Sequence, residues 1–160
     1  MGNKTLIYEQ KVQDNLKESY NHLFRLNNAF KELEKSYNFL LDKTAFDKIM
    51  ENNQDLAYSD QIIYRFSKLQ DTMGAKLFKS VLLYQGENVN KPFLDILNQL
   101  EKINIVNVEE WFEIRDLRNE IAHNYNNNDN AALNILNMIY QLKTELARIL
   151  KSISELILNN

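Results

Sequence analysis

The 160-residue sequence contains no cysteine, one proline and only three glycines. Without cysteine the chain forms no disulfide and offers no thiolate to a metal ion, which fits a cytoplasmic protein. All-β folds need many turn residues, so the scarcity of glycine and proline favours helices. No apolar run reaches the length of about 18 residues that suggests a membrane-spanning helix, so we expect no membrane segment.

A dense run of lysine and arginine is also missing, and 19 basic against 22 acidic residues give a net charge of −3. Proteins that bind nucleic acids without sequence preference usually carry a basic face. Any contact with RNA must therefore be local or be built by two copies of the chain. Two histidines without cysteine give no recognised metal spacing, and no phosphate-binding glycine loop occurs, so we expect no metal and no cofactor.

Apolar residues recur at steps of three and four along most of the chain, which is the period of an amphipathic helix. We predict one domain over residues 1–160, an all-α, up-and-down bundle of four main helices with one additional short helix. The predicted main helices span residues 6–42, residues 59–84, a segment beginning after Asn107, and residues 131–158. The additional helix follows Pro92, and residues 43–55 can form a further short turn of helix.

Local signals predict where these helices begin and end. Ser59-Asp60 can cap the second main helix, and Asn107 the third, with Glu110 at the spacing of a capping box. Asp129 or Asn130 can cap the last helix, and Gly86 is a suitable C-terminal cap. Inside the second main helix, Gly74 predicts close packing against another helix, because glycine there otherwise weakens the helix.

The only tryptophan and one of the two histidines lie in a single stretch, residues 111–125, with the sequence WFEIRDLRNEIAHNY. Within it Arg118 is followed five positions later by His123, and then by Tyr125. Arginine is a permanent cation that can hold phosphate with two bonds, and histidine exchanges a proton near neutral pH. Arginine, histidine and a hydroxyl at one helix end are suited to chemistry on a phosphodiester.

Helical geometry constrains this group. Arg118 falls on the same stripe as Trp111, Ile114 and Ile121, so its charge needs a partner or a wet cleft. His123 lies about 140° around the helix from Arg118. We therefore expect either that the helix unwinds at its end or that a second copy of the chain completes the site.

A purely structural interpretation is also open. Arg118 can pair with Glu113 or Asp60 in the core, and His123 can cap a carbonyl at the helix end. The other histidine, His22, lies beside the apolar stripe of the first helix, where we expect a partly exposed surface residue rather than a functional one.

The pattern Arg-x4-His-x-Tyr resembles the signature of HepT-like toxins in the HEPN superfamily, in which a polar residue, here Asn119, usually follows the arginine. Residues 63–76 are similar to the second helix of HEPN proteins that serve as substrate-binding subunits of nucleotidyltransferases. Together these two similarities cover roughly residues 58–158.

The resemblance to HepT implies an endoribonuclease toxin that works as a homodimer and without a metal. The ribose 2′-hydroxyl would attack the adjacent phosphate, with His123 moving the proton and Arg118 stabilising the transition state. Asn119 would hold the phosphate or orient His123. Arg65, Lys68 and Arg115 are candidates for further phosphate contacts, the alternative for Arg65 and Lys68 being a solvated helix face.

The same resemblance implies a protein partner. In HepT-like pairs a nucleotidyltransferase antitoxin of the MNT type transfers AMP to the tyrosine of the motif, which is Tyr125 in this chain. We expect Tyr125 to lie in a mobile, asparagine-rich loop that such an enzyme can reach. The second similarity implies an alternative function, a non-catalytic subunit that binds a substrate or nucleotide for a nucleotidyltransferase.

Overall fold

The computed structural model describes residues 2–159, and all regular secondary structure in this range is helical. The elements in chain order are α1 (Gly2–Glu34), α2 (Lys43–Glu51), α3 (Asn53–Thr72), the π-helical turn η1 (Met73–Leu77), α4 (Phe78–Tyr84), α5 (Phe93–Lys102), α6 (Val108–Asn124) and α7 (Asp129–Leu158). The predicted all-α fold class is confirmed.

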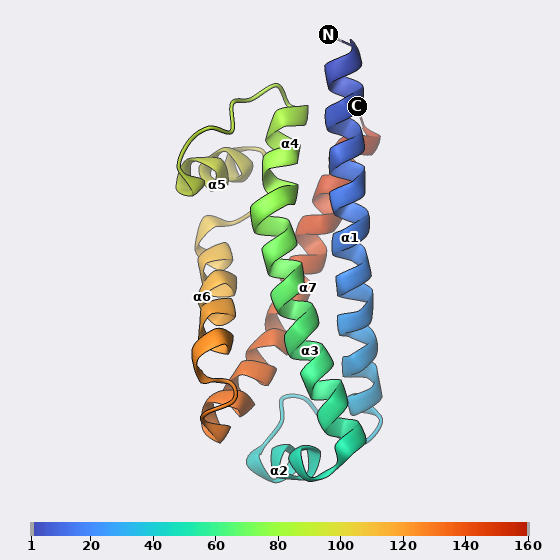
Figure 1. Ribbon diagram of the computed structural model, residues 1–160, viewed down its shortest axis with the longest axis vertical. Coiled ribbons are helices and arrows are strands. Elements are labelled where there is room, and N and C mark those ends of the chain that lie inside the picture. Colours follow the sequence, from blue (N-terminus) through green and yellow to red (C-terminus); the bar gives the residue numbers. More distant parts are fainter. Residues whose placement is uncertain (1, 160) are drawn as a thin grey trace.

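Four long rods form the bundle, and α3, η1 and α4 together make one of them (Figure 1). The rods α1, α3–α4, α6 and α7 alternate in direction, so the N-terminal end of α1 and the C-terminal end of α7 lie at the same end of the molecule. Two short helices, α2 and α5, lie in the connections between the rods. The additional helix predicted after Pro92 is α5, and the further helical turn allowed for residues 43–55 is α2, in which Phe46 and Ile49 are buried.

Large side chains from every rod fill the core. The aromatic members that are almost completely buried are Trp111, Phe30, Phe46, Phe66 and Phe78. The rings of Phe78 and Trp111 meet edge to face with centroids 4.6 Å apart, which joins α4 to α6. Each such burial contributes about 1.5–3 kcal/mol to folding, so these contacts fix how the rods pack.

The predicted helix over residues 6–42 is wrong at its C-terminal end, because α1 stops at Glu34. Tertiary contacts with α7 override the continuing helical pattern. The ring of Phe39 stacks on Tyr140 at a centroid distance of 4.6 Å. The Asn137 side chain accepts a hydrogen bond from the Leu41 N–H at 2.8 Å and donates one to the Leu41 carbonyl at 3.0 Å. The backbone N–H and carbonyl of Leu41, which lie outside any helix, therefore find their hydrogen-bond partners on α7.

Two predicted N-terminal caps are wrong. The cap of α3 is Asn52, whose side chain accepts from the Asp55 N–H at 3.0 Å, so the helix begins before Ser59. The cap of α7 is Asn128, which accepts from the Ala131 N–H at 3.1 Å. Ser59, Asp60, Asn128, Asp129 and Asn130 are all residue types that cap helices well, so local sequence alone does not choose the cap.

Two other predicted caps are confirmed. Asn107 accepts from the Glu110 N–H at 3.0 Å and starts α6. Gly86 has a φ of +82°, and the N–H groups of Gly86 and Glu87 bond to the carbonyls of Leu83 and Leu82. This is the paired pattern of a Schellman motif, which a glycine in left-handed conformation permits.

The close packing predicted at Gly74 is also confirmed. A Cβ on Gly74 would lie 3.3 Å from Cζ2 of Trp111 and 3.4 Å from Nε2 of Gln70, so a side chain here would crowd both residues. Gly74 belongs to η1, where the N–H of Phe78 bonds to the Met73 carbonyl. The rod is thus locally wider at the point where Trp111 of α6 packs against it.

Candidate functional site

The motif residues lie at the C-terminal end of α6, and the helix does not unwind there. Helical structure continues through His123 to Asn124. Trp111, Ile114 and Ile121 are buried as the helical stripe predicts. Of the two arrangements expected from the sequence, unwinding within one chain is therefore excluded.

Arg118 reaches from α6 to α3 and forms an ion pair with Asp71, rather than with Glu113 or Asp60. Its Nε lies 3.2 Å from Oδ1 and its Nη2 lies 3.2 Å from Oδ2, so the guanidinium fork holds both carboxylate oxygens. The two side chains are 30% and 47% exposed. A pair this exposed contributes only about 0–1 kcal/mol, and a stronger anion can displace Asp71 at small cost.

The Arg118 side chain lines an open hollow of about 490 Å³ between α3 and the end of α6, here called the α3–α6 hollow. Its lining residues are Asp60, Ile63, Tyr64, Ser67, Lys68, Asp71, Arg118, Tyr125 and Asn126. Two cations and two carboxylates therefore share one polar space with several hydroxyl and amide groups. The Lys68 ammonium lies 5.7 Å from the centroid of the Tyr64 ring. An anion with several oxygens, such as phosphate, fits this set of donors.

Tyr125 differs from the expectation of a mobile loop residue. Its backbone continues the helical conformation of α6, and its half-buried side chain packs against the core. Its hydroxyl lies 2.9 Å from Oγ of Ser59, which is fully buried in α3. Burial raises the pKa of Tyr125, and the hydrogen bond with Ser59 opposes that rise in part. The only sequence signal for this contact is a small hydroxyl residue on the inner face of the α3 helix.

His123 and Asn119 are exposed, and neither lines the α3–α6 hollow. Within residues 2–159 the His123 ring has no hydrogen bond or ion pair, and its backbone carbonyl accepts from the Asn127 side chain at 3.4 Å. One chain thus brings Arg118, Lys68 and Tyr125 together but leaves His123 outside.

Arg65 points toward α1 instead of the hollow. Its Nη1 lies 3.0 Å from Nδ1 of His22, and its buried Nε has no partner. His22 is only 9% exposed, so the expected surface histidine is a buried one. The reason is the close packing of α1 on α3, which covers both side chains.

Arg115 lines a second, smaller hollow of about 260 Å³ beside η1, here called the η1 hollow. Its lining residues are Gln70, Asp71, Gly74, Ala75, Phe93 and Arg115. The Arg115 guanidinium carbon lies 5.6 Å from the centroid of the Phe93 ring. Because Asp71 lines both hollows, the η1 hollow adjoins the α3–α6 hollow.

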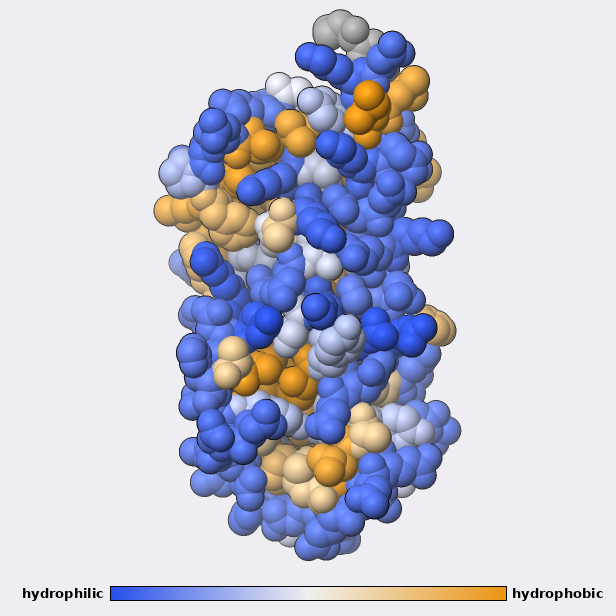
Figure 2. Space-filling view, viewed as in Figure 1, coloured by the Kyte–Doolittle hydropathy of each residue, from blue (hydrophilic) through white to orange (hydrophobic). Residues whose placement is uncertain are grey.

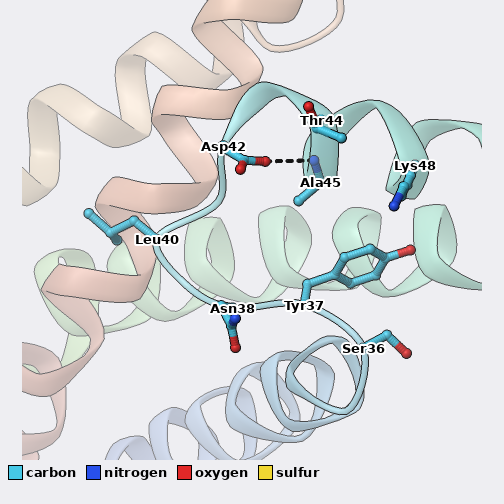
Figure 3. A pocket seen from close by; sticks show the side chains of 8 residues that line it. All are labelled: Ser36, Tyr37, Asn38, Leu40, Asp42, Thr44, Ala45 and Lys48. Atoms are coloured by element: carbon cyan, nitrogen blue, oxygen red, sulfur yellow. Dashed lines mark hydrogen bonds between the residues drawn. The ribbon is translucent and has the colours of Figure 1, made fainter.

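A third hollow, of about 520 Å³, lies at the corner between α1 and α2 (Figure 3). Its polar groups hold the corner together. Asp42 accepts from the Ala45 N–H at 2.8 Å, and Tyr37 donates to Asp55 at 2.6 Å. The hydrogen bond to Asp55 raises the pKa of Tyr37 to about 12. Lys48 is the single cation in this lining, which makes the corner a poorer anion site than the α3–α6 hollow.

Among the described residues 2–159, no three histidine or acidic side chains are grouped closely enough to hold a metal ion. In the same range, none of the helices combines the length and the apolar character needed to cross a membrane. The face that carries α3, α4 and α6 is mostly polar, with apolar side chains in scattered patches (Figure 2). A protein contact on this face would therefore be rich in polar groups.

Comparison with protein-family models, curated proteins and solved structures finds no match to this chain. The resemblance to HEPN proteins therefore depends on the sequence motif alone.

The buried His22 predicts a pH dependence of stability. Burial lowers the pKa of His22 below its ordinary value of 6.5, as do the charges of Arg65, Lys68 and Arg25, against the opposing effect of Glu18. Below pH 6.5 the unfolded chain binds a proton at His22 more readily than the folded chain does, so the free energy of unfolding falls as the pH drops through this range.

We expect the His22→Gln variant to lose less stability than the parent protein between about pH 7.5 and about pH 5.5, measured by urea denaturation. His123→Gln, which alters an exposed histidine, is the matched control and should follow the parent. Equal pH slopes for His22→Gln and the parent would contradict this prediction.

Proposed function

We propose that the chain is a metal-independent endoribonuclease of the HEPN type, the toxin of a HEPN/MNT toxin–antitoxin pair. The observation that carries this proposal is the position of Arg118 in an open polar hollow beside Lys68 and Tyr125. These residues offer two cations and a hydroxyl at the end of the helix that also carries His123.

The ion pair between Arg118 and Asp71 supports a phosphate site. A phosphodiester presents two non-bridging oxygens in a geometry similar to a carboxylate, and an arginine fork binds either. Asp71 thus occupies the position that RNA phosphate would take. Because the pair is exposed, its loss costs little when phosphate arrives, and the ammonium of Lys68 adds a second positive charge.

The exposed position of His123 supports a site shared by two protomers. We propose a symmetric homodimer with the ends of α6 near the two-fold axis, in which the His123 ring of one protomer would enter the α3–α6 hollow of the other. Two chains would also bring two Arg118 and two Lys68 side chains to one RNA strand. These cations would act locally, because a dimer doubles the net negative charge of the single chain.

In the proposed reaction the ribose 2′-oxygen forms a bond to the adjacent phosphorus, and the bond from phosphorus to the 5′-oxygen breaks. The products are a 2′,3′-cyclic phosphate and a free 5′-hydroxyl. His123 takes the proton from the 2′-hydroxyl or gives one to the leaving oxygen. Arg118 stabilises the charge that develops on the phosphate oxygens, and Asn119 is the candidate to orient His123.

We expect His123→Ala to lower the initial rate of RNA cleavage about 10²–10⁴-fold and Arg118→Ala about 10²–10³-fold. Asn124→Ala, which changes the exposed neighbour of His123, is the control and should keep the parent rate. The measurement is cleavage of a labelled single-stranded RNA, with circular dichroism to confirm that each variant is folded.

A DNA strand of the same sequence should not be cut, because it lacks the attacking hydroxyl. A folded His123→Ala protein that cleaves RNA at the parent rate would remove the enzymatic proposal.

The proposed control by a nucleotidyltransferase concerns Tyr125. AMP on the Tyr125 hydroxyl would place a phosphate charge beside Arg118 and Lys68, occupy the phosphate position and exclude RNA. Because that hydroxyl is hydrogen-bonded to the buried Ser59, this hydrogen bond must break before the hydroxyl can react with a nucleotide.

This geometry predicts opposite effects for two substitutions. After co-expression with the cognate nucleotidyltransferase, intact mass should show added AMP on the parent protein and none on Tyr125→Phe, which should still cleave RNA. Ser59→Ala should be modified about 2- to 10-fold faster, because one neutral hydrogen bond no longer holds the hydroxyl. Full modification of Tyr125→Phe would exclude Tyr125 as the target.

A second candidate function is a non-catalytic subunit that binds a substrate or nucleotide for a nucleotidyltransferase. The position of His123 outside the hollow, and the Arg118–Asp71 pair within it, favour binding without catalysis in the single chain. Expression of the chain alone separates the two functions. Growth arrest that the partner relieves supports the toxin, and normal growth supports the binding subunit.

A further inference from the structure

The η1 hollow contains a polar side chain without a protein partner. Gln70 is 8% exposed as a residue and its side chain makes no hydrogen bond or ion pair within residues 2–159, yet its amide atoms are not fully buried, so they face the water of the hollow. Its amide lines the η1 hollow, and its Nε2 lies next to Gly74. A ligand in this hollow can exchange the water at the Gln70 amide for direct hydrogen bonds, and one that does not would leave the amide unpaired.

The other walls of this hollow suit a flat ring. The Phe93 ring forms one wall, with the Arg115 guanidinium near it at 5.6 Å from the ring centroid. Gly74 forms another wall, and the absence of a side chain there lets Trp111 pack directly against it from the other side. Aromatic and guanidinium groups are the usual stacking surfaces for bases of single-stranded nucleic acids.

The volume of about 260 Å³ is slightly below the range of about 300–1,000 Å³ for drug-sized ligands. One heterocyclic ring system suits this space better than a whole nucleotide does. The phosphate of such a nucleotide can lie in the adjoining α3–α6 hollow. Arg115 and Arg118 are three residues apart on α6, and Asp71 lines both hollows.

We infer that the η1 hollow is a nucleobase subsite that binds the base of the nucleotide whose phosphate meets Arg118. Gln70 selects adenine, because a glutamine amide can donate and accept at the two ring-edge positions of adenine at once. This inference rests on the proposed function for the phosphate position, and it adds a base preference that the motif does not contain. Gln70 acts in specificity and takes no part in bond cleavage.

The test measures binding of fluorescently labelled hexa-adenylate and hexa-uridylate RNA to the full chain carrying His123→Ala, so that RNA is not cut. Gln70→Leu should weaken hexa-adenylate binding about tenfold and hexa-uridylate binding much less. Gln61→Leu makes the same change on α3 outside the η1 hollow and should leave both affinities unchanged.

A second readout is the indole N–H signal of Trp111 in a nitrogen–proton NMR spectrum, which is a single peak because the chain has one tryptophan. Trp111 packs directly behind Gly74, so a base in the η1 hollow should shift this peak. AMP alone forms the second arm. A shift with AMP but not with RNA assigns the subsite to a free nucleotide, and a shift with hexa-adenylate assigns it to an RNA strand.

Should Gln70→Leu fail to fold, Phe93→Leu removes the stacking ring and should weaken hexa-adenylate binding in the same direction. Unchanged hexa-adenylate affinity in these variants, or an unmoved Trp111 signal with every ligand, overturns the subsite. Arg118-dependent RNA cleavage with no base preference overturns the subsite alone. Gln70-dependent binding without any cleavage by the chain with His123 intact supports the subsite and removes the endoribonuclease.

Discussion

The packing of Trp111 against Gly74 is the contact on which the arrangement of the site depends. Trp111 is completely buried, and its ring meets α4 through Phe78 and the π-helical turn through Gly74. This contact fixes the rotation of α6 about its own axis. Arg118 lies seven residues, or about two turns, further along α6, so the same rotation returns it toward α3. The Arg118–Asp71 pair and both neighbouring hollows follow from that contact.

Charge in the α3–α6 hollow is nearly balanced. Arg118 and Lys68 stand against Asp60 and Asp71, and burial raises the pKa of Asp60. The net charge of the hollow is therefore close to zero until an anion displaces one of the two carboxylates. Under the proposed function, contact with RNA would accordingly be local to this hollow.

Features that depend on local sequence could be predicted. The helical period, the buried stripe of α6, and the roles of Gly74, Gly86 and Asn107 each follow from residues close together in the chain. For the site, the sequence predicts that Arg118 needs a partner and that His123 lies on another side of the helix. The structure agrees on both points.

Features that depend on distant residues could not be predicted. The end of α1 is set by Asn137 and Tyr140 of α7, and the partner of Arg118 is an aspartate 47 residues away. The Ser59–Tyr125 bond spans 66 residues. In each case the sequence offers several side chains of equal chemistry, and only the packing of the rods selects one. The unpaired amide of Gln70 could not be predicted either, because the sequence does not show which side chains lack a hydrogen-bond partner.

We propose that the Asp71 carboxylate occupies, on Arg118, the position that a nucleic-acid phosphate would take. The most direct test is the affinity of the chain for a single-stranded DNA oligonucleotide, which lacks the attacking hydroxyl and is not cut. Asp71→Asn should tighten binding roughly two- to fivefold by freeing Arg118. Asp60→Asn removes the same charge from the same hollow without breaking the ion pair, and its effect should be clearly smaller. Equal gains for both variants, or no gain for Asp71→Asn, would contradict the claim.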